Sequence, residues 1–265
     1  MSPKVAFVTG GARGIGLAIV QKFAASGFNV MVGDLGSSQS QWNYALASAD
    51  DLASVKSTTT ETEIAAVELD VTQESSCKNA IAATLKKFGR LDVLINNAGI
   101  VQSGPLEEFS EQDWDQVFAV NSKGLFLMSK AALEPLTASG DAAIINTASI
   151  AGKKGVRNMA AYCGSKFAAI GITQSLAAEF APRHIRVNAI CPGIVGTAMW
   201  LEHLLPSNTL DQQDKQTNFE EAVSSMIPLK RAQSAEDMAD AAFYLATARN
   251  VTGVALTIAG GMEMN

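Results

Sequence analysis

Short apolar runs alternate along this chain with longer stretches of helical periodicity. Seven of the runs predict β-strands, and several of these are apolar throughout, as strands covered on both faces are. The predicted strands span residues 4–9, 29–34, 64–70, 92–96, 142–149, 185–191 and 254–258. Predicted helices include residues 14–26, 73–88, 114–138, 160–181 and 235–246. This alternation implies right-handed βαβ crossovers, and therefore an α/β fold with a parallel, doubly wound sheet and helices on both faces.

Two segments depart from this rhythm. Residues 36–63 are rich in Ser, Thr and Ala without a sustained apolar period, and they predict a surface helix with a flexible tail. Residues 198–227 form a long insertion after the sixth predicted strand and carry Trp200, Leu201, Leu204 and Leu205. Long insertions in compact domains are often lids or binding loops, although a decorative excursion is the alternative. We expect one domain over residues 1–265 with this insertion as its substrate loop.

Composition indicates a compact globular protein. The 265 residues are 48% hydrophobic and 17% charged, and the net charge is −6. An acidic chain without a Lys/Arg run offers little attraction to nucleic acid or to an anionic membrane, so neither is an expected partner. No apolar stretch approaches the length of a membrane span, and the first residues run into a strand without a signal-peptide core, which predicts a cytoplasmic location.

The three cysteines, Cys77, Cys163 and Cys191, are odd in number and far apart. They show no CxxC spacing, so the sequence supports neither a disulfide framework nor a zinc site. We expect reduced, mostly buried thiols and no metal ligands.

A glycine-rich turn joins the first strand to the first helix. Glycines at such a turn allow a pyrophosphate to approach the backbone, and the unpaired N–H groups of the helix N-terminus favour its charge. Nucleotide binding is favoured over a purely structural turn because a strand precedes the turn and a helix follows it. The candidate residues are Gly10, Arg13, Gly14, Ile15 and Gly16.

The second predicted strand ends in Asp34, 18 residues beyond Gly16. A carboxylate at this position can accept hydrogen bonds from the adenosine ribose hydroxyls and repels a 2′-phosphate. One exposed Arg13 is not enough to outweigh that repulsion, so NAD is the expected cofactor rather than NADP. The alternative is that Asp34 is an exposed residue at a strand end.

Tyr162 and Lys166 are four residues apart at the start of a predicted helix, with Ser149 upstream. Residues at this spacing share a helix face, so the Lys ammonium can reach the Tyr oxygen or its partner. An ammonium nearby lowers the pKa of a phenol, and general acid–base catalysis needs a pKa nearer neutrality than the ordinary Tyr value of about 10. Chance pairing is the alternative for the pair taken alone.

These motifs occur in a characteristic order. The spacing of Gly10 and Gly14, the run 96–99, Ser149, the Tyr162–Lys166 pair and Pro192-Gly193 together resemble a classical short-chain dehydrogenase/reductase. The resemblance extends from residue 4 to residue 261. It implies a Rossmann-type sheet of seven parallel strands, a cofactor across their carboxyl ends, and hydride transfer at a hydroxyl-bearing carbon.

The resemblance also implies roles for further residues. Asp70 and Val71 match the pair that contacts adenine, and the run Asn96, Asn97, Ala98 and Gly99 matches the segment that supports the central strand and lies along the cofactor. Of this run, Asn97, Ala98 and Gly99 are the expected cofactor-binding residues. Asn121 matches a helix residue that supports the Lys through a water, although it is also compatible with an Asn bonded only to backbone. Pro192, Gly193, Ile194 and Thr197 match the segment that contacts the nicotinamide carboxamide. Ala259 stands where many relatives carry Asp, which leaves only a C-terminal contact in doubt.

The implied mechanism is proton transfer beside hydride transfer. In oxidation, Tyr162 would take the alcohol proton while Ser149 donates a hydrogen bond to the same oxygen. Lys166 would hold the ribose hydroxyls and keep Tyr162 acidic, and Asn121 with water would relay the proton outward. Ser149 could instead satisfy only a strand end.

Loop sequences point to a class of substrate. Residues 191–200 and 260–265 are similar to those of acetoin reductases (2,3-butanediol dehydrogenases) and polyol dehydrogenases. A small diol needs an apolar wall and a few polar anchors. Met199, Trp200 and Leu201 are candidates for the wall, and Gln102, Asn158 and His203 are candidates for the second hydroxyl, although all have ordinary packing or surface alternatives.

Two alternative functions remain on the same scaffold. A 3-oxoacyl-carrier-protein reductase is disfavoured by Asp34, since such reductases usually resemble NADPH users, and by the lack of a basic docking patch. A non-catalytic dinucleotide sensor is disfavoured because the set of Asn121, Ser149, Tyr162 and Lys166 is complete.

The helices predicted at residues 114–138 and 160–181 carry more apolar positions than one face against a sheet requires. These positions include Phe118, Leu125, Phe126, Met128, Phe167, Ile170 and Ile172. In the proteins that this chain resembles, the two helices pack against their copies as a four-helix bundle and the last strand pairs subunits again. We therefore expect a homotetramer, with a dimer as the alternative.

Overall fold

A computed structural model describes residues 2–36, 48–55, 62–196 and 212–264. Its centre is a parallel sheet of seven strands in the order β3-β2-β1-β4-β5-β6-β7. The strands are β1 (Val5–Thr9), β2 (Asn29–Asp34), β3 (Ile64–Glu68), β4 (Val93–Asn96), β5 (Ala142–Thr147), β6 (Ile185–Pro192) and β7 (Ala255–Ile258). The predicted strands and the doubly wound fold are confirmed, and each strand end lies within two residues of its predicted position.

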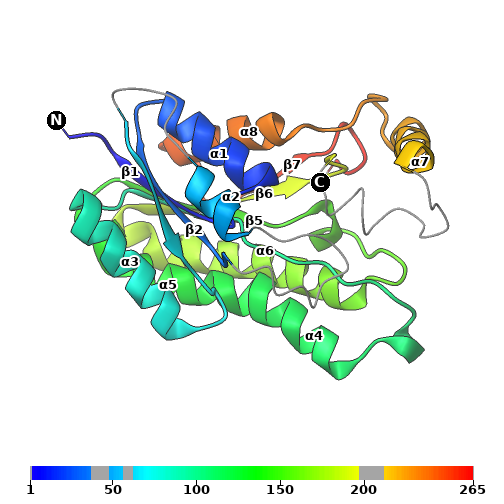
Figure 1. Ribbon diagram of the computed structural model, residues 1–265, viewed down its shortest axis with the longest axis horizontal. Coiled ribbons are helices and arrows are strands. Elements are labelled where there is room, and N and C mark those ends of the chain that lie inside the picture. The colour runs from blue at the N-terminus through cyan, green and yellow to red at the C-terminus, as the bar shows by residue number, and fades with distance from the viewer. Residues whose placement is uncertain (1, 37–47, 56–61, 197–211, 265) are drawn as a thin grey trace.

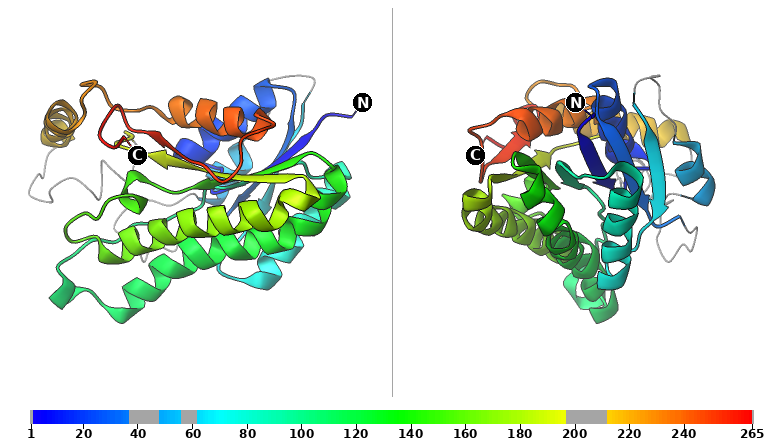
Figure 2. Two further views of the ribbon diagram at one scale, coloured as in Figure 1. Left: turned by 180° about the vertical axis from the view of Figure 1, so that it is seen from behind. Right: turned by 90° about the vertical axis from the view of Figure 1, so that its left-hand side faces the viewer.

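Helices cover both faces of the sheet (Figures 1 and 2). One face carries α1 (Gly14–Ala25) and α8 (Ala235–Thr247), and the other carries α3 (Glu74–Phe88), α5 (Leu125–Ser139) and α6 (Ala160–Phe180). Each layer is held by its own apolar core. On one face, Phe23 of α1 packs edge-to-face against Phe28 and against Phe243 of α8. On the opposite face, Phe7 and Leu94 lie fully buried.

The remaining described elements are short or lie at the periphery. They are α2 (Ala49–Ser54), α4 (Glu111–Phe118), α7 (Gln212–Met226) and the 3-10 turns at Leu106–Glu108, Ile150–Gly152 and Ala181–Arg183. The helix expected in residues 36–63 is therefore present as α2, which a Ser48–Asp51 capping box begins. Residues 37–47, 56–61 and 197–211 lie outside the described residues, so the tail expected in residues 36–63 remains a prediction. Of the insertion expected at residues 198–227, the part Gln212–Met226 forms α7, and its role as a substrate loop remains a prediction.

The single helix expected at residues 114–138 is instead interrupted. α4 and α5 are joined by a π-helical segment, Ala119–Gly124, whose centre is Asn121. The Asn121 side chain donates to the carbonyl of Ile100 and accepts from its N–H, each at 2.9 Å. A wide turn of this kind is a recognised insertion in helices at functional sites, and here it accompanies an Asn that pairs with a loop rather than facing solvent.

The amino ends of the central strands are tied by a buried carboxylate. Asp92 accepts from the N–H of Val5 at 2.8 Å, from Ser139 Oγ at 2.6 Å and from the Arg90 guanidinium at 2.6 and 2.8 Å. Burial raises the pKa of Asp92, but these four hydrogen bonds outweigh it and hold that pKa below its ordinary value. The opposite, carboxyl end of the sheet is the one left open for a ligand.

Candidate active site

A cleft of about 1650 Å³ opens at the carboxyl ends of the strands. It lies where β1 is flanked by β2 on one side and β4 on the other, which is the point where strand order reverses. Consecutive helices leave the sheet on opposite faces there, so the loops diverge and leave a crevice. The loops after β1, β2, β4, β5 and β6 all contribute residues to its lining.

The glycine-rich turn is shaped for close approach of a ligand backbone. Gly10 has a φ of +62°, which favours glycine, and a Cβ added there would lie 2.9 Å from the Cα of Ala98. A Cβ at Gly16 would lie 2.0 Å from the carbonyl oxygen of Gly10, so no other residue fits. The N-cap residue of α1, Arg13, does not cap the helix with its side chain. A pyrophosphate therefore fits the first turn of α1 on both space and charge.

Neighbouring residues brace this turn. The hydroxyl of Thr9 accepts from the N–H groups of Asn97 and Ala98, each at 3.0 Å. The Asn97 side chain in turn donates to the carbonyls of Thr9 at 3.2 Å and Gly10 at 3.0 Å. The loops after β1 and β4 are thereby held together as one wall of the cleft.

Asp34 lies at the carboxyl end of β2 and lines the cleft. One of its oxygens accepts from the N–H of Ala12 at 3.0 Å and the other from the N–H of Leu35 at 2.9 Å. Burial raises the pKa of Asp34, while these N–H groups and the charge of Arg13 act in the opposite direction. Each carboxylate oxygen keeps a second lone pair that a ribose hydroxyl can use.

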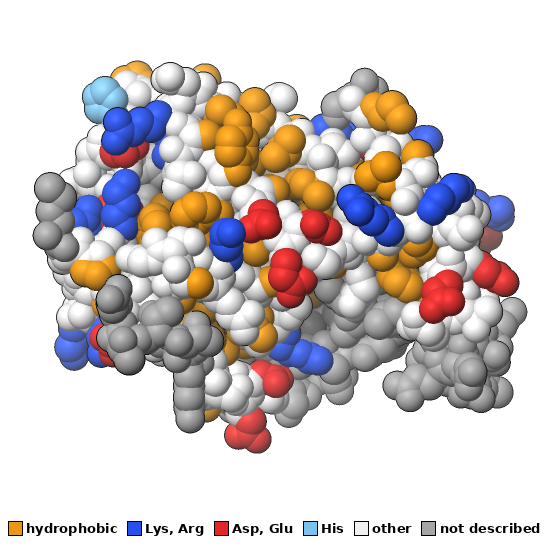
Figure 3. Space-filling model, turned by 90° about the horizontal axis from the view of Figure 1, so that it is seen from above, with side chains coloured by type: hydrophobic (Ala, Val, Ile, Leu, Met, Phe, Trp, Pro, Cys, Tyr) orange, Lys and Arg blue, Asp and Glu red, His pale blue; other side chains and the backbone are white. Residues whose placement is uncertain are grey.

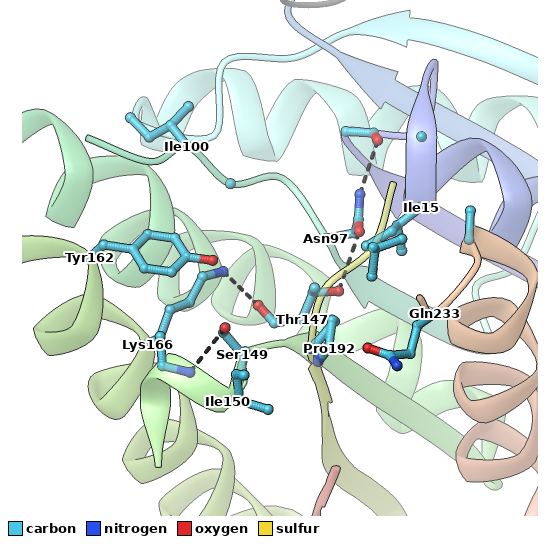
Figure 4. Close-up of a pocket in the computed structure, with 18 of the residues that line it drawn as sticks. Ile15, Asn97, Ile100, Thr147, Ser149, Ile150, Tyr162, Lys166, Pro192 and Gln233 are labelled. Carbon is cyan, nitrogen blue, oxygen red and sulfur yellow. Dashed lines mark hydrogen bonds between the residues drawn. The ribbon is translucent and has the colours of Figure 1, made fainter. Parts of the chain in front are cut away.

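Lys166 lies almost completely buried on the first turns of α6, at 4% exposure. Its ammonium donates to the carbonyl of Thr147 at the end of β5, at 2.8 Å, and lies 5.6 Å from the centre of the Tyr162 ring. Burial lowers the pKa of Lys166 to about 8. Figure 4 shows the Tyr162 hydroxyl and the Lys166 ammonium converging at the floor of the cleft.

Ser149 begins the 3-10 turn that follows β5, and its Oγ accepts from the N–H of Ala151 at 3.1 Å. As an acceptor in that bond, the hydroxyl still has its own proton to donate. The hydroxyl points into the same cleft as Tyr162 and Lys166 (Figure 4). The structure therefore brings together the three residues that the sequence singled out.

Asn121 is not among the residues that line the cleft. Its Nδ2 also donates to Ser165 Oγ at 3.0 Å, so its side chain is held by protein groups. It nevertheless lies close to the lysine, because a Cβ added at Gly99 would be 3.4 Å from both Asn121 Oδ1 and Lys166 Nζ.

Most of the predicted site residues line the cleft. They are Gly10, Arg13, Gly14, Ile15, Gly16, Asp34, Asp70, Val71, Asn97, Ala98, Gly99, Ser149, Asn158, Tyr162, Lys166, Pro192 and Gly193. Four residues named from the motifs do not: Asn96, Asn121 and Gln102 lie outside the lining, and Ile194 is fully buried against Phe219 and Val223 of α7. Thr197, Met199, Trp200, Leu201 and His203 are outside the described residues.

Several lining residues were not predicted from the sequence. Thr147 receives the lysine ammonium through a main-chain carbonyl, which no side-chain pattern reveals. Gln233 lines the cleft beside Pro192 and is 6% exposed. Val156, Met226 and Met262 add apolar surface to the lining; of these, Met226 and Met262 lie in segments that the sequence singled out, residues 198–227 and 260–265.

The geometry supports one kind of chemistry. One end of the cleft accommodates a pyrophosphate and a ribose, and the other end presents a hydroxyl, a phenol and an ammonium. Among the described residues, no cluster of His, Cys, Asp and Glu could hold a metal ion. Within that same part of the chain, no helix has the length and apolarity needed to cross a membrane. These features define a dinucleotide-dependent enzyme that exchanges a proton with a substrate oxygen.

Comparison with known proteins agrees with this class. Residues 4–204 match the short chain dehydrogenase family. The chain is 39% identical over 265 residues to the L-2,3-butanediol dehydrogenase of Corynebacterium glutamicum, with 99% of each chain covered. It is 36% identical over 269 residues to the 2,5-dichloro-2,5-cyclohexadiene-1,4-diol dehydrogenase of Sphingobium indicum, covering 100% of this chain and 98% of the relative. The solved structure of carveol dehydrogenase from Mycobacterium avium in complex with NAD superposes with a TM-score of 0.89 at 27% identity, covering 99% and 98% of the two chains.

The chain belongs to the short-chain dehydrogenase family. It is an oxidoreductase that acts on the CH–OH group of secondary alcohols and uses a nicotinamide dinucleotide. The resemblance stated from the motifs is thereby confirmed.

Proposed function

We propose that this enzyme interconverts a small vicinal diol or polyol and the matching hydroxyketone, with NAD(H) as the cofactor. The observation that carries the proposal is the single cleft that joins Asp34 at one end to Ser149, Tyr162 and Lys166 at the other. A dinucleotide extended between them would place its nicotinamide beside the tyrosine. Both named relatives in the sequence comparison are diol dehydrogenases, which supports a diol as the substrate.

The preference for NAD follows from the electrostatics of the adenosine end. Asp34 is held toward the cleft by the N–H groups of Ala12 and Leu35, so its position is fixed. A 2′-phosphate there would meet this carboxylate, and a pair of like charges about 4 Å apart costs about 4 kcal/mol at an effective dielectric constant near 20. Arg13 interacts favourably with Asp34, so part of its charge is already compensated.

The bound cofactor supplies hydride acceptance in oxidation and hydride donation in reduction. Tyr162, as the phenolate, takes the proton from the substrate hydroxyl, and Ser149 donates a hydrogen bond to the same oxygen. Lys166 stabilises the phenolate electrostatically and is placed to hold ribose hydroxyls. Because its pKa is lowered to about 8, Lys166 remains mostly charged at neutral pH while lying close to its titration point.

Asn121 is the residue we assign to the outward end of the proton path. Its Oδ1 and the Lys166 ammonium flank the same point beside Gly99. A water between them would connect the lysine to the main-chain groups of Ile100, which Asn121 already binds. This assignment requires the π-helical turn, which keeps the Asn121 side chain turned inward.

The substrate end of the cleft combines apolar and polar groups, as a small diol requires. Among the residues that line the cleft, Ala151, Val156, Met226 and Met262 supply apolar surface, and Asn158 supplies a polar side chain. Met199, Trp200, Gln102 and His203 remain candidates on sequence grounds.

Substrate and cofactor are tested together by a panel of polyols, vicinal diols and hydroxyketones, each assayed with NAD(H) and NADP(H) by the absorbance of the reduced nicotinamide. We expect 2,3-butanediol and acetoin, or a short polyol, to give the highest kcat/KM, with NAD(H) preferred at least tenfold. Higher kcat/KM for a carrier-protein ketoacyl substrate with NADPH would overturn the proposal.

We also propose a homotetramer. Trp114, Phe126 and Phe167 on α4, α5 and α6 are 41%, 47% and 47% exposed, whereas Leu125 and Met128 pack within the protein's own core. On the other side of the molecule, apolar side chains gather on the face that carries α1 and α8 (Figure 3), and Tyr244 of α8 is 56% exposed. Two separate apolar surfaces are what a tetramer with two-fold symmetry needs.

The cytoplasm is the compartment we infer. All three cysteines, Cys77, Cys163 and Cys191, are buried free thiols, and burial raises the pKa of Cys77 and of Cys191 to about 11. Protonated, buried thiols are compatible with a reducing environment, and they form no disulfide that would need an oxidising one.

A further inference from the structure

A second lysine, Lys153, lies just after the turn that carries Ser149. Its ammonium donates to the carbonyl of Ala255 at 2.7 Å and to the hydroxyl of Thr257 at 2.8 Å. Both acceptors belong to β7, about a hundred residues further along the chain. Neither Lys153 nor its two acceptors line the cleft, so none of them is placed to touch the cofactor or the substrate.

The acceptors lie on the outer edge of the sheet. The carbonyls of Val254 and Ile258 accept from the N–H groups of Ala189 and Gly193 and therefore face β6. Carbonyls alternate in direction along a strand, so that of Ala255 faces away from β6, toward the side where β7 has no neighbouring strand in the sheet. Lys153 thus binds the free edge of the last strand.

The contacts close a ring around Ser149. The N–H of Gly152 donates to the carbonyl of Ser149 at 2.9 Å, and that of Lys153 donates to the carbonyl of Ile150 at 2.9 Å. The N–H of Ala148, the residue before Ser149, donates to the carbonyl of Ile190 on β6 at 2.9 Å, and the next residue of β6, Cys191, pairs in register with Thr257 of β7. From Ser149 the ring passes through the turn to Lys153, across to Thr257, and back through β6 to Ala148.

We propose that Lys153 is a positioning residue for the reaction: its ammonium fixes the Ser149 turn to the edge of β7, and so sets where the Ser149 hydroxyl meets the substrate oxygen. The inference rests on the proposed function, because Ser149 must act on that oxygen. The position of a hydrogen-bond donor matters strongly in such sites, since a displacement of about 1 Å is able to cost about 100-fold in rate.

The neighbouring Lys154 provides a matched control. It carries the same charge, is exposed, and takes part in the turn through its main-chain N–H, which donates to Ile150. We compare Lys153→Met with Lys154→Met, and add Thr257→Val, which removes one acceptor and keeps the shape of the strand. Lys153→Met should lower kcat for 2,3-butanediol or acetoin at least tenfold, Thr257→Val should lower it by a smaller factor, and Lys154→Met should leave it unchanged. The dissociation constant for NADH should stay within twofold in all three.

A double-mutant cycle with Ser149→Ala separates positioning from general loss of structure. If Lys153 acts through Ser149, Lys153→Met should cost less than about threefold in kcat/KM once Ser149 has been removed. A cost as large in the Ser149→Ala protein as in the parent would overturn the proposal.

Hydrogen–deuterium exchange of a peptide covering residues 148–153 gives a measurement that needs no substrate. Lys153→Met and Thr257→Val should speed exchange of these amides at least tenfold, and Lys154→Met should not. Unchanged exchange in Lys153→Met would refute the proposal that Lys153 fixes the Ser149 turn to β7. If the wild type is inactive on every diol and hydroxyketone in the panel, the proposed function fails while the exchange result still decides whether Lys153 fixes the turn.

Discussion

Gly152 and Lys166 touch through their backbones: a Cβ added at Gly152 would lie 2.6 Å from the carbonyl oxygen of Lys166. The turn that carries Ser149 is therefore seated directly on the helix that carries the lysine. No flexible side chain separates the two, so the distance between the serine and the lysine is set by the backbone.

Gly152→Ala should consequently lower both stability and activity, although it adds only one methyl group. The methyl group must push the turn away from α6, and overpacking of this kind costs about 1–3 kcal/mol of unfolding free energy. We expect a lower melting temperature and a lower kcat. Gly155→Ala is the control, because a Cβ there meets nothing within 4 Å. Equal stability and activity of the two variants would contradict the close packing.

Tyr162→Phe should abolish turnover and preserve the fold. The ring packs in a buried cluster with Val101, Ala151, Met159 and Cys163, and phenylalanine keeps those contacts. Loss of the acid–base oxygen should lower kcat by about 10²–10⁴-fold. NADH binding, measured by fluorescence titration, should change little. Activity within a few-fold of the parent would remove Tyr162 from its assigned role.

Lys166→Met should change the pH dependence of stability in the cofactor-free protein. Burial lowers the pKa of Lys166 from 10.5 to about 8. Between these values the unfolded chain holds a proton that the folded protein has released, so the parent gains stability as pH rises from about 8 to about 10.5. Below pH 8 it bears the full cost of a buried charge, about 3 kcal/mol at 1.36 kcal/mol per pH unit.

The methionine variant carries no such cost. It should therefore be more stable than the parent at pH 7, and this advantage should shrink as the pH is raised toward 10.5. Denaturant titrations at pH 7, 8.5 and 10 measure the difference. A stability advantage that is the same at all three pH values would mean that burial does not lower the pKa of Lys166.

Asp34→Ala should narrow the preference for NAD. Removal of the carboxylate relieves repulsion of a 2′-phosphate and releases Arg13 to attract it, and each tenfold change in specificity corresponds to about 1.4 kcal/mol. Because Asp34 also accepts from Ala12 and Leu35, Asp34→Asn is the control that keeps an acceptor and the side-chain shape. The ratio of kcat/KM for the two cofactors should shift at least tenfold in the alanine variant. A parent enzyme that prefers NADP would show that Asp34 does not select the cofactor.

Phe167→Glu should weaken assembly. The side chain is 47% exposed on α6 and, in the proposed tetramer, is buried against a second subunit. A charge without a partner in an apolar interface is strongly unfavourable. Light scattering at micromolar concentration should give a tetramer mass for the parent and a lower mass for the variant. A monomeric parent would refute the assembly.

The sequence was most informative where local chemistry determines structure. Apolar runs predicted each of the seven strands. Gly10 and Gly16 predicted a tight turn, and the structure shows that a side chain at either position would collide with neighbouring atoms. The spacing of Tyr162 and Lys166 predicted a shared helix face, which places both in the cleft.

Contacts that depend on the tertiary fold were not predictable in this way. Lys166 binds a main-chain carbonyl of Thr147, and every residue has such a carbonyl. Lys153 reaches β7 only because the sheet places the last strand beside the Ser149 turn. The π-helical turn at Asn121 was hidden inside a helical pattern, and the Asn121 side chain pairs with the backbone of Ile100, a residue of a different loop.

The strand order has a further consequence for synthesis of the chain. β1 is made first; it is apolar from Val5 to Val8 and buried over its whole length, yet its partner β4 begins only at Val93. While the intervening residues emerge from the ribosome, one edge of β1 has no strand to pair with. An unpaired apolar edge is a template for association with other chains. The nascent protein therefore exposes this edge of β1 to association with other chains until β4 pairs with it, and the same pairing brings together Thr9 and Asn97, which form one wall of the cleft.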